Sequence, residues 1–556
     1  MGADVRFAWL TAAVLLIGAG LRVGQYAMGE ALWYDELALA RNLVERSFHE
    51  LVTLPLDYAQ VAPPGFLLLE KLAITVLGNN EYALRLFPLL CALASLPLVA
   101  EVARRMLLTG AAFIAVMMFS LSPTIIGFGS QVKQYSTDVA AALLMTTLTL
   151  RWWEGRNSRD GAVSAATLLG MLGCVAVWFS QAAVLVLGGL SLALLLGTVL
   201  QRERATLRNV ALITIIWGTG MVGAVIWALQ NASPATHAYM HEYWAEGFMP
   251  LPPWSGDEAV WLWRTLRSFL YRQLRYPFPA VGVILTALGA VILVKRRQWF
   301  AFVVIAPLGV ALLASAAQLY PVGERVSLFL LPGILVLMAE GVDRVRHTAS
   351  AYWLPLGATV FALAAATSVY TLYRYFPLYP KKEIKDVLAY VQTRRQPHDA
   401  VYVYHNAWHA VAYYGPRYGL LSQDVVLGFC PGSDSRRLID ELDQFRGRPR
   451  LWLIISHAVG PYREREAMLS YLASIGTQRD SIVTGRSRLS SSAYLYDLSD
   501  PERLRSTLAE TYVLPEREHG IREFPCPPGS IKHSAASPLA GFERDSVVSR
   551  ARKPLR

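Results

Sequence analysis

Long apolar runs recur along the first two-thirds of the chain, separated by short polar stretches. Most runs have 17 to 22 residues, and about 20 helical residues cross roughly 30 Å of hydrocarbon. The pattern therefore predicts about eleven transmembrane helices. Their expected ranges are 7–27, 84–103, 109–128, 137–153, 161–179, 181–200, 209–229, 277–294, 299–319, 326–343 and 351–372.

The segment 63–78 (PPGFLLLEKLAITVLG) is apolar but does not fit a span. It opens with two prolines and carries Glu70 and Lys71 at its middle, where charges cost several kcal/mol in a bilayer. We predict that it lies in the membrane interface. With that choice the basic clusters between later spans all fall on one side, as the positive-inside rule requires. These clusters are Arg104/Arg105, Arg151/Arg156/Arg159, Arg202/Arg204/Arg208, Lys295/Arg296/Arg297 and Arg344/Arg346.

This orientation predicts a cytoplasmic N-terminus and an outer face built from four segments. They are the loop 28–83, the turn 129–136 with the head of the next helix, the aromatic loop 230–276 and the turn 320–325. The first run, 7–27, is long for the apolar part of a signal peptide and lacks a small-residue cleavage site. We expect it to remain as a signal anchor.

The pattern changes after the last span. Helix-like and strand-like stretches alternate from 373 to 500, which predicts a small α/β domain on the outer side. Pro, Ser and Arg dominate from 501 to 556, so we expect a poorly ordered tail. The predicted fold class is an α-helical polytopic membrane domain, residues 1–372, followed by a periplasmic α/β domain.

Composition supports a membrane protein, since 54% of the residues are hydrophobic. The net charge of +11 does not indicate nucleic-acid binding, because much of it lies in the loop clusters that set orientation. Of the four cysteines, Cys91 and Cys174 fall in apolar runs. Cys430 and Cys526 lie in the polar part, and whether they pair is open from the sequence.

Asp35 and Glu36 are adjacent carboxylates where the first apolar run gives way to the outer loop (WYDELALARN). Apolar residues then recur at steps of three and four, which predicts an amphipathic helix on the outer interface. Asp35 fits two roles that do not exclude each other. It is either the N-cap of this helix, with Glu36 favoured by the helix dipole, or a general base for an incoming hydroxyl.

Asp138 begins the predicted span 137–153 on the same face (YSTDVAAALLM). It also reads as an N-cap or as a second functional carboxylate. Lys133 and Tyr135, just before it, are candidates for binding phosphate and sugar, with a role as interface anchors as the alternative.

Arg325 lies in an outer turn (VGERVSLFLLP), where the positive-inside bias disfavours arginine. A phosphate head group at this level would account for it through charge-assisted hydrogen bonds. Pairing with Glu324 or with lipid phosphate is the alternative. Arg85, at the outer end of the span 84–103, is a candidate of the same kind, with lipid contact as its alternative.

His237 and His241 are spaced i,i+4 (THAYMHEYW), which places both imidazoles on one helix face, as a metal site needs. The HExxH signature is absent, so a polar interface helix explains the pair as well. His405 and His409 repeat the spacing in the α/β domain. The aromatic loop is typical of an interfacial belt, and its Tyr243 and Trp244 are candidates for stacking on a sugar.

Several motifs in order resemble a known family. An acidic pair in the first outer loop is followed by VAPPGFLLLEKL, by GNNEYALRLFPLL and by a Gln-x3-Tyr-x2-Asp stretch. This order is similar to GT-C class membrane glycosyltransferases, in particular the family 39/83 protein O-mannosyltransferases, the aminoarabinose transferase and the RgtA-B-C-D-like group. The resemblance covers about residues 7 to 345 and is strongest over 30–155.

The resemblance implies an inverting transfer of a sugar from a polyprenyl-phosphate donor on the outer face of a bacterial plasma membrane. It assigns the catalytic base to Asp35, with Glu36 as partner, a second acidic position to Asp138, and phosphate binding to Arg325. Many relatives carry His or Lys just before the first proline, where this chain has Ala62. Phosphate binding then depends on groups such as Lys133, and no cofactor is required, although a divalent metal stays open.

Two other functions fit parts of the pattern. An O-antigen-ligase or polymerase type of enzyme would use a pyrophosphate-linked oligosaccharide and favours more outer-face Arg and His. A lipid or sugar transporter would need charges near mid-bilayer. No Walker loop, Rossmann fingerprint or serine-nucleophile elbow is present, so the sequence shows no nucleotide-dependent machinery. The sugar and the acceptor are not readable from the sequence.

Overall fold

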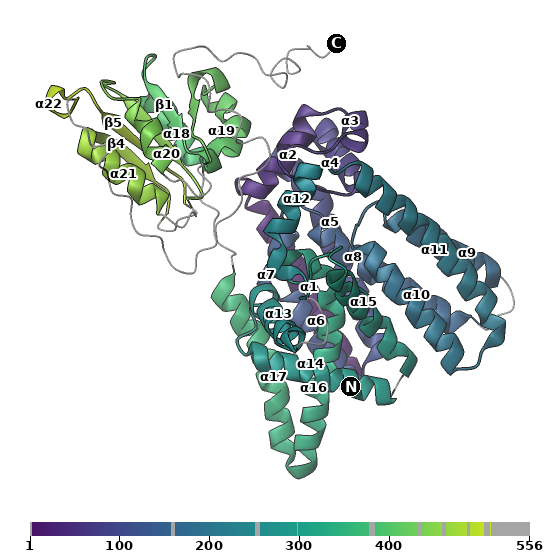
Figure 1. Cartoon of the computed structure of the whole chain (residues 1–556). Helices are drawn as coiled ribbons and strands as arrows, with labels where there is room; N and C mark the ends of the chain where they lie inside the picture. Colours follow the sequence, from purple (N-terminus) through teal and green to yellow (C-terminus); the bar gives the residue numbers. More distant parts are fainter. Residues whose placement is uncertain are drawn as a thin grey trace.

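Long helices dominate the computed structural model, which describes residues 3–156, 162–250, 256–296, 298–376, 384–430, 436–458, 463–485, 490–504 and 512. Among the described helices, eight are long and apolar enough to cross a membrane. The chain is a multi-pass membrane protein. These helices are α1 (Ala3–Ala27), α5 (Glu81–Met106), α10 (Ala183–Leu200), α11 (Arg204–Gln230), α14 (Pro279–Arg296), α15 (Gln298–Ala316), α16 (Leu331–Tyr352) and α17 (Leu354–Tyr375) (Figure 1).

The other three predicted spans are helical but do not meet the same criterion of length and hydropathy. α8 (Tyr135–Gly155) is long enough but less apolar, and α9 (Ala162–Ala176) is short. The predicted span 109–128 is divided into α6 (Thr109–Ser120) and α7 (Pro123–Phe128). Pro123 has no amide hydrogen to continue α6, and Ser122 caps the new helix by accepting from the amide of Ile125.

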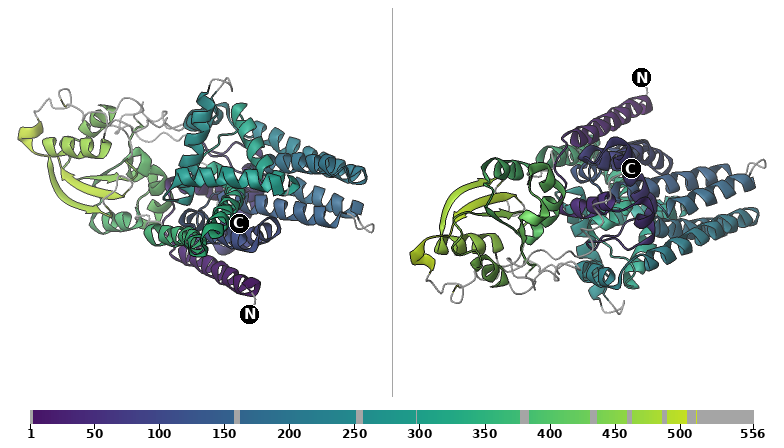
Figure 2. Two further views of the ribbon diagram at one scale, coloured as in Figure 1. Left: turned by 90° about the horizontal axis from the view of Figure 1, so that it is seen from below. Right: turned by 90° about the horizontal axis from the view of Figure 1, so that it is seen from above.

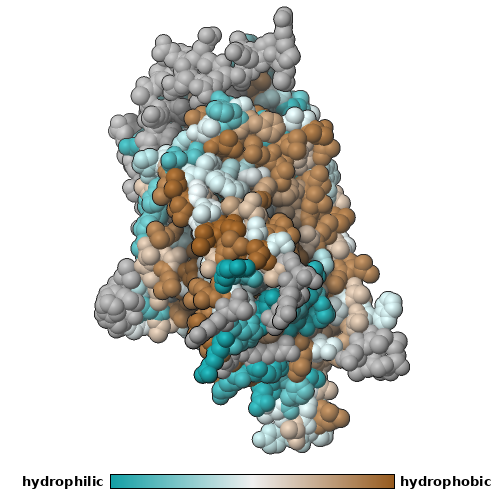
Figure 3. All heavy atoms as spheres, turned by 90° about the vertical axis from the view of Figure 1, so that its right-hand side faces the viewer, coloured by the Kyte–Doolittle hydropathy of each residue, from teal (hydrophilic) through white to brown (hydrophobic). Residues whose placement is uncertain are grey.

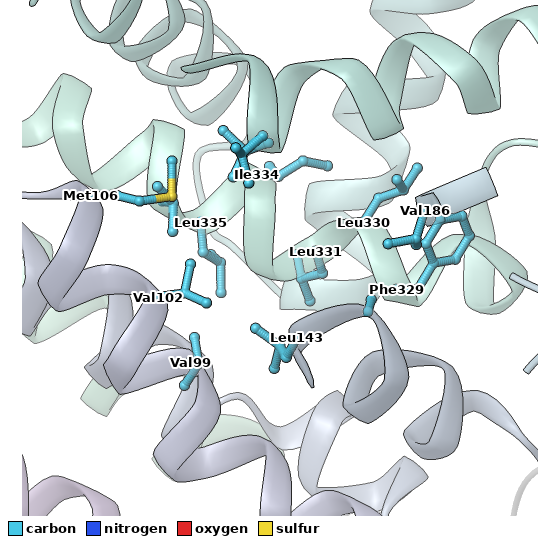
Figure 4. Packing of buried hydrophobic residues seen from close by; sticks show 14 of the residues in the cluster. Val99, Val102, Met106, Leu143, Val186, Phe329, Leu330, Leu331, Ile334 and Leu335 are labelled. Carbon is cyan, nitrogen blue, oxygen red and sulfur yellow. The ribbon is translucent and has the colours of Figure 1, made fainter. Parts of the chain in front are cut away.

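The core of the bundle forms around α16, which is the most deeply buried of the eight long helices. Aliphatic side chains from α5, α8, α10 and α16 meet there with Phe329 and Leu330, which lie just before α16 (Figure 4). α14 and α16 approach closely because Gly289 and Gly341 carry no side chain, and an added Cβ would collide with a carbonyl of the facing helix. Small residues permit such contacts between membrane helices. Hydrophobic residues cover much of the side of the molecule that Figure 3 shows.

α1 packs against α5 and α6 in this bundle. The guanidinium of its fully buried Arg22 donates to the carbonyl oxygens of Gly18 at 2.9 Å and Ser120 at 3.0 Å. Ser120 ends α6, where carbonyl groups have no partner within the helix. Arg22 therefore ties α1 to the end of α6.

Short helices gather with the longer α13 (Asp257–Leu274) at the end of the bundle where the candidate residues lie. The short ones are α2 (Tyr34–Glu45), α3 (Phe48–Thr53), α4 (Pro64–Leu77), α12 (Pro234–Tyr243) and the 3-10 helices η1 (Ala245–Gly247) and η2 (Glu324–Leu330). The predicted single amphipathic helix after Asp35 is divided into α2 and α3, because Ser47 and Glu50 form a capping box that starts a new helix.

The sheet domain, Ile384–Leu504, carries five strands. They are β1 (Ala400–Val403), β2 (Val426–Leu427), β3 (Leu451–Ile455), β4 (Thr477–Val483) and β5 (Ser492–Asp497), in the order β2-β1-β3-β5-β4. β1 is parallel to β2 and β3, whereas β5 is antiparallel to β3 and β4. The helices around them are α18 (Ile384–Arg394), α19 (Trp408–Tyr414), α20 (Arg436–Asp443), α21 (Glu464–Ile475) and α22 (Pro501–Leu504), with 3-10 turns η3 (His405–Ala407), η4 (Gly415–Tyr418) and η5 (Ser422–Asp424).

The sheet domain and the first outer loop share one hydrophobic core, which includes residues of α2 and α4 together with α18, α19 and the sheet. Figure 2 shows the sheet domain at one side of the helical bundle. Polar contacts reinforce the junction: the Tyr414 hydroxyl donates to Glu81 at 2.8 Å, and Lys385 lies 2.8 Å from the same carboxylate. The sheet domain is therefore fixed on the outer loop.

The cysteines of the apolar runs and of the sheet domain differ in state. Cys91 and Cys174 are free, and Cys430 is disulfide-bonded. Cys526 lies outside the described residues, as does nearly all of the predicted tail 501–556.

Candidate active site

Asp35 and Arg325 meet at the end of the helical bundle that the sequence predicts to be the outer one, although they lie far apart in the sequence. Asp35 is the second residue of α2, and Arg325 is the second residue of η2. The Asp35 carboxylate lies 2.6 Å from the Arg325 guanidinium, and the two side chains are 25% and 26% exposed. The pair is partly shielded from solvent yet open to a ligand. Trp33, not Asp35, is the N-cap of α2, so the predicted capping role of Asp35 is wrong.

Positive charge surrounds the Asp35 carboxylate. Burial disfavours its charged form, but the charges of Arg325, Lys133 and His457 outweigh burial and hold the pKa of Asp35 below its usual value. Asp35 is therefore ionised near neutral pH. An ionised carboxylate is the form that can accept a proton from a hydroxyl.

Lys133 stands in the turn between α7 and α8. Its ammonium group donates to the side-chain oxygen of Gln60 at 2.5 Å, and the residue is only 8% exposed. Burial lowers the pKa of Lys133 to about 8, although the charge of Asp35 acts in the opposite direction. Together Lys133 and Arg325 give the site one more positive charge than Asp35 neutralises, which suits an anionic ligand.

Glu36 and Arg85 form a buried ion pair behind the site. Arg85 donates to both oxygens of Glu36 at 3.1 Å, and the residues are 1% and 3% exposed. Glu36 also accepts from the backbone amides of Trp33 and Val132, both at 2.8 Å. One carboxylate thus joins α2, α5 and the turn that carries Lys133. Because both side chains are buried and paired with each other, neither is open to a ligand, as the predicted catalytic role of Glu36 and phosphate-binding role of Arg85 would require.

Aromatic rings surround the Arg325 guanidinium. It lies 6.0 Å from the centre of the Tyr135 ring and 5.6 Å from that of Trp244, and one of its nitrogens is 3.5 Å from the Tyr243 hydroxyl. Its Nε is buried and has no hydrogen-bond partner among the described residues. The three predicted substrate-binding aromatics therefore do converge, but around Arg325. Tyr135 and Trp244 provide cation–π contacts to the guanidinium, and the Tyr243 hydroxyl accepts a hydrogen bond from it.

Asp138 lies deeper, in the first turn of α8, and is 6% exposed. It accepts a hydrogen bond from the Ser180 hydroxyl at 2.6 Å. No hydrogen bond or ion pair within the described residues joins it to Asp35 or Arg325. Asp138 is thus buried against Ser180, in the turn before α10, and its catalytic role stays a prediction.

His237 and His241 lie on α12, and both are exposed. The ring of His241 stacks on Phe248, with 4.8 Å between the centroids. Within the described ranges, no group of three or more His, Cys, Asp or Glu side chains is arranged to hold a metal ion. The two imidazoles thus lack a third donor among those residues, and the pattern fits an interface helix better than a metal site.

The sheet domain adds histidines that the sequence did not single out for this site. The His457 ring packs edge-on against Trp33, with 4.2 Å between centroids, and the His409 ring packs against Tyr34 at 5.1 Å. These two aromatic residues immediately precede Asp35. Burial lowers the pKa of His409 to about 3, so this imidazole is neutral.

Comparisons with known proteins identify a similar family and a similar fold. Residues 61–227 match the family model of dolichyl-phosphate-mannose-protein mannosyltransferase. The structure is similar to that of ArnT from Cupriavidus metallidurans bound to undecaprenyl phosphate, with a TM-score of 0.51 and 12% identity over 89% of this chain and 98% of that chain. This is a membrane glycosyltransferase with the GT-C fold.

Two further solved structures are also similar to the glycosyltransferase. The apo form of ArnT from Cupriavidus metallidurans has a TM-score of 0.51 at 14% identity, over 89% of this chain and 98% of that chain. The Archaeoglobus fulgidus oligosaccharyltransferase has a TM-score of 0.49 at 12% identity, over 88% and 75%. No curated protein sequence matches the chain. The resemblance to the ArnT and protein mannosyltransferase group therefore rests on the family model and the fold.

The candidate site of this glycosyltransferase thus contains three groups that the sequence pointed to together. Asp35 contacts Arg325, and Lys133 lies close enough for its charge to act on both; Glu36 and Arg85 pair behind them. The family match includes Lys133 and Arg85, whereas Asp35 and Arg325 lie outside residues 61–227. His457 was not predicted, and its only signal was its place directly after a strand-like run, RLWLIIS.

Proposed function

We propose that this glycosyltransferase moves a sugar from a polyprenyl-phosphate donor to an acceptor hydroxyl, with Asp35 as the general base. The observation that carries the proposal is the contact of the ionised Asp35 with Arg325, beside the cationic Lys133. One carboxylate and two cations match the needs of a proton acceptor and a phosphate leaving group. The ArnT structure with undecaprenyl phosphate supports a donor of this chemical class.

The proposed reaction inverts the anomeric centre in one displacement. The acceptor oxygen forms a bond to the anomeric carbon while its proton passes to Asp35. The bond between that carbon and the lipid phosphate breaks, and its electron pair goes to the phosphate oxygen. Arg325 and Lys133 neutralise the charge that develops on the phosphate, which is the electrostatic stabilisation that lowers such barriers.

The ion pair between Asp35 and Arg325 sets the order of events in this proposal. In the free enzyme Arg325 occupies one oxygen of the base. The donor phosphodiester carries one negative charge, as a carboxylate does, and its two free oxygens compete with Asp35 for the planar guanidinium. In this proposal, phosphate binding draws Arg325 away from Asp35 and frees the carboxylate for the acceptor hydroxyl. We infer that the donor binds before the base becomes competent.

No metal ion takes part in the proposed step. Arg325 and Lys133 already supply two positive charges at the leaving phosphate, and Arg325 occupies an oxygen of Asp35. His237 and His241 are exposed on α12 and have no third donor among the described residues. The chain's own cations therefore take the role that a divalent ion has in other transferases.

The proposed orientation places the site on the outer face of a bacterial plasma membrane. The first part of α5 carries Arg85 beside the site. Its last turn, at the far side of the bundle, carries Arg104 and Arg105. Basic clusters mark the cytoplasmic side. A reporter fused after residue 80 should therefore read outside the cell, and a cytoplasmic reading would contradict this orientation.

The test of the function is sugar transfer by the purified full-length protein. Polyprenyl-phosphate mannose with a tritiated sugar serves as the donor probe, and an envelope membrane extract serves as the acceptor. Asp35→Asn should lower turnover roughly 10²- to 10⁴-fold, since the amide cannot take the proton. Asp57→Asn is the matched control, because Asp57 lies in the same outer loop and is exposed.

Two results would contradict the proposal. If Asp35→Asn turns over as the wild type does, Asp35 is not the base. If only a pyrophosphate-linked oligosaccharide serves as donor, the enzyme belongs to the ligase or polymerase type instead.

A further inference from the structure

His457 lies at the carboxyl end of the central strand β3, and functional groups of such sheets commonly gather at these strand ends. It follows β3 by two residues, and β3 is parallel to its neighbour β1. β2 lies on one side of β1 and β3 on the other. Ligands of open α/β sheets bind beyond the carboxyl ends of strands where the order reverses in this way. In this protein Trp33 and Tyr34 of the outer loop pack against that edge.

The backbone of His457 adopts a conformation that few side chains favour. Its φ is +55°, in the left-handed region, which costs a non-glycine residue free energy. The Asn406 side-chain amide donates to the His457 carbonyl at 2.9 Å, which holds this conformation. Strained residues that are held by their surroundings cluster at functional sites.

The imidazole of His457 is also held in one orientation. Its Nδ1 lies 2.8 Å from the Ser456 hydroxyl, which in turn lies 3.0 Å from the Ser491 hydroxyl. Ser456 and Ser491 are both 1% exposed. A hydrogen bond at one ring nitrogen fixes the tautomer and the direction of the other. The sheet domain thus holds this imidazole as a functional site requires.

The ring is held next to the segment that carries the base. It packs 4.2 Å from Trp33 and 6.1 Å from Tyr34, measured between ring centroids. It is also close enough to Asp35 for its charge to act on that carboxylate. Arg325 and Lys133 come from the helix ends, so the residues that face Asp35 arise from two different domains.

We propose that His457 positions the acceptor hydroxyl against Asp35. The inference rests on the proposed function, in which a donor with a lipid tail brings its phosphate to Arg325 and Lys133 from the bundle. The side of Asp35 that faces the sheet domain is then the approach for the acceptor. An imidazole there hydrogen-bonds the acceptor oxygen and aligns it with the anomeric carbon, while Asp35 takes the proton.

The experiment compares kinetic constants for the two substrates in the full-length protein. Polyprenyl-phosphate mannose is the donor probe, and graded amounts of envelope membrane extract are the acceptor. His457→Gly should lower kcat/KM for the acceptor about tenfold or more, since one oriented hydrogen bond is lost. The KM for the donor should stay within about twofold of wild type, because Arg325 and Lys133 are intact. His457→Gln should recover part of the loss, since an amide also bonds a hydroxyl.

Stability separates a positioning role from a structural one. Glycine adopts a φ of +55° without strain, so His457→Gly should retain its unfolding temperature while it loses acceptor use. His398→Ala is the matched control, because His398 is exposed and precedes β1 at the opposite edge of the sheet. This variant should behave as the wild type does.

The outcomes distinguish this inference from the proposed function. An acceptor kcat/KM that does not change in His457→Gly overturns the inference, as does a loss of activity that follows a loss of stability in all variants. Asp35→Asn is measured in the same assay. If it is inactive while the His457 variants are fully active, only the inference fails. If Asp35→Asn is active, the proposed function fails.

Discussion

Replacing Glu36 by glutamine is expected to loosen the whole candidate site. The Glu36 carboxylate accepts two hydrogen bonds from Arg85 and one each from the amides of Trp33 and Val132. A glutamine side chain keeps one oxygen and replaces the other by an NH₂ group. This group cannot accept the hydrogen bonds that the surrounding N–H groups donate to the carboxylate. Glu36→Gln therefore leaves Arg85 as a buried charge without its partner.

The magnitude follows from the burial of the pair. Both side chains are less than 5% exposed, and removing one partner of a buried ion pair costs about 3–5 kcal/mol. Glu45→Gln on the same helix is the control. Glu45 pairs with Arg41, but its side chain is 36% exposed, and such surface pairs contribute at most about 1 kcal/mol. The same substitution is made at both positions, so burial and the number of hydrogen bonds account for the difference between their effects.

Hydrogen exchange of the two amides that donate to Glu36 gives a local measure of this loss. If local opening becomes easier by about 3 kcal/mol, exchange at Trp33 and Val132 should accelerate roughly 10²-fold, since each 1.4 kcal/mol is a factor of ten. Sugar transfer should fall as well, because Asp35 and Lys133 lose their common support. Exchange and turnover in Glu36→Gln that match those of Glu45→Gln would refute this reasoning.

Three further predictions concern charge at the site. Arg325→Gln should reduce kcat roughly 10²- to 10³-fold. The acid limb of its kcat/KM–pH profile should move to higher pH, because Arg325 helps to hold the pKa of Asp35 low in the free enzyme. An acid limb at the wild-type pH would show that the two groups do not interact. The KM for the donor should rise as the pH increases through about 8, where the buried Lys133 loses its proton. The Lys133→Arg variant stays charged and should show no such rise. Identical KM–pH profiles of the two proteins would exclude Lys133 from phosphate binding. EDTA should leave turnover unchanged, and activity restored only by a divalent ion would contradict the metal-free step.

The positions of the membrane helices were predictable because hydropathy in a bilayer acts on whole segments. Each predicted span corresponds to helical residues, and 63–78 forms the short helix α4 beside α2 and α3. The break between α6 and α7 was missed, since the apolar run continues through Ser122 and Pro123 while the backbone does not. Average hydrophobicity carries no information about a missing amide hydrogen.

The candidate site was predictable only in part. Arg325 was found because an arginine on the outer face runs against the positive-inside bias. Glu36 and Arg85 were selected by the same logic of charge, but the sequence does not show that they bury each other. His457 escaped notice, because its place beside Trp33 depends on how the sheet domain packs on the outer loop. Pairings between distant segments are set by tertiary packing, which local patterns do not encode.

The core that joins the sheet domain to the outer loop has a consequence for how the protein opens. Apolar residues of α2, α4, α18 and α19 are buried in one cluster, so neither side can expose its surface without the other. Segments that share a core unfold and refold together as one cooperative unit. The base, its support and the sheet domain should therefore gain and lose protection in a single step. A chain cut before α18 would lack half of the material that orders its own catalytic loop.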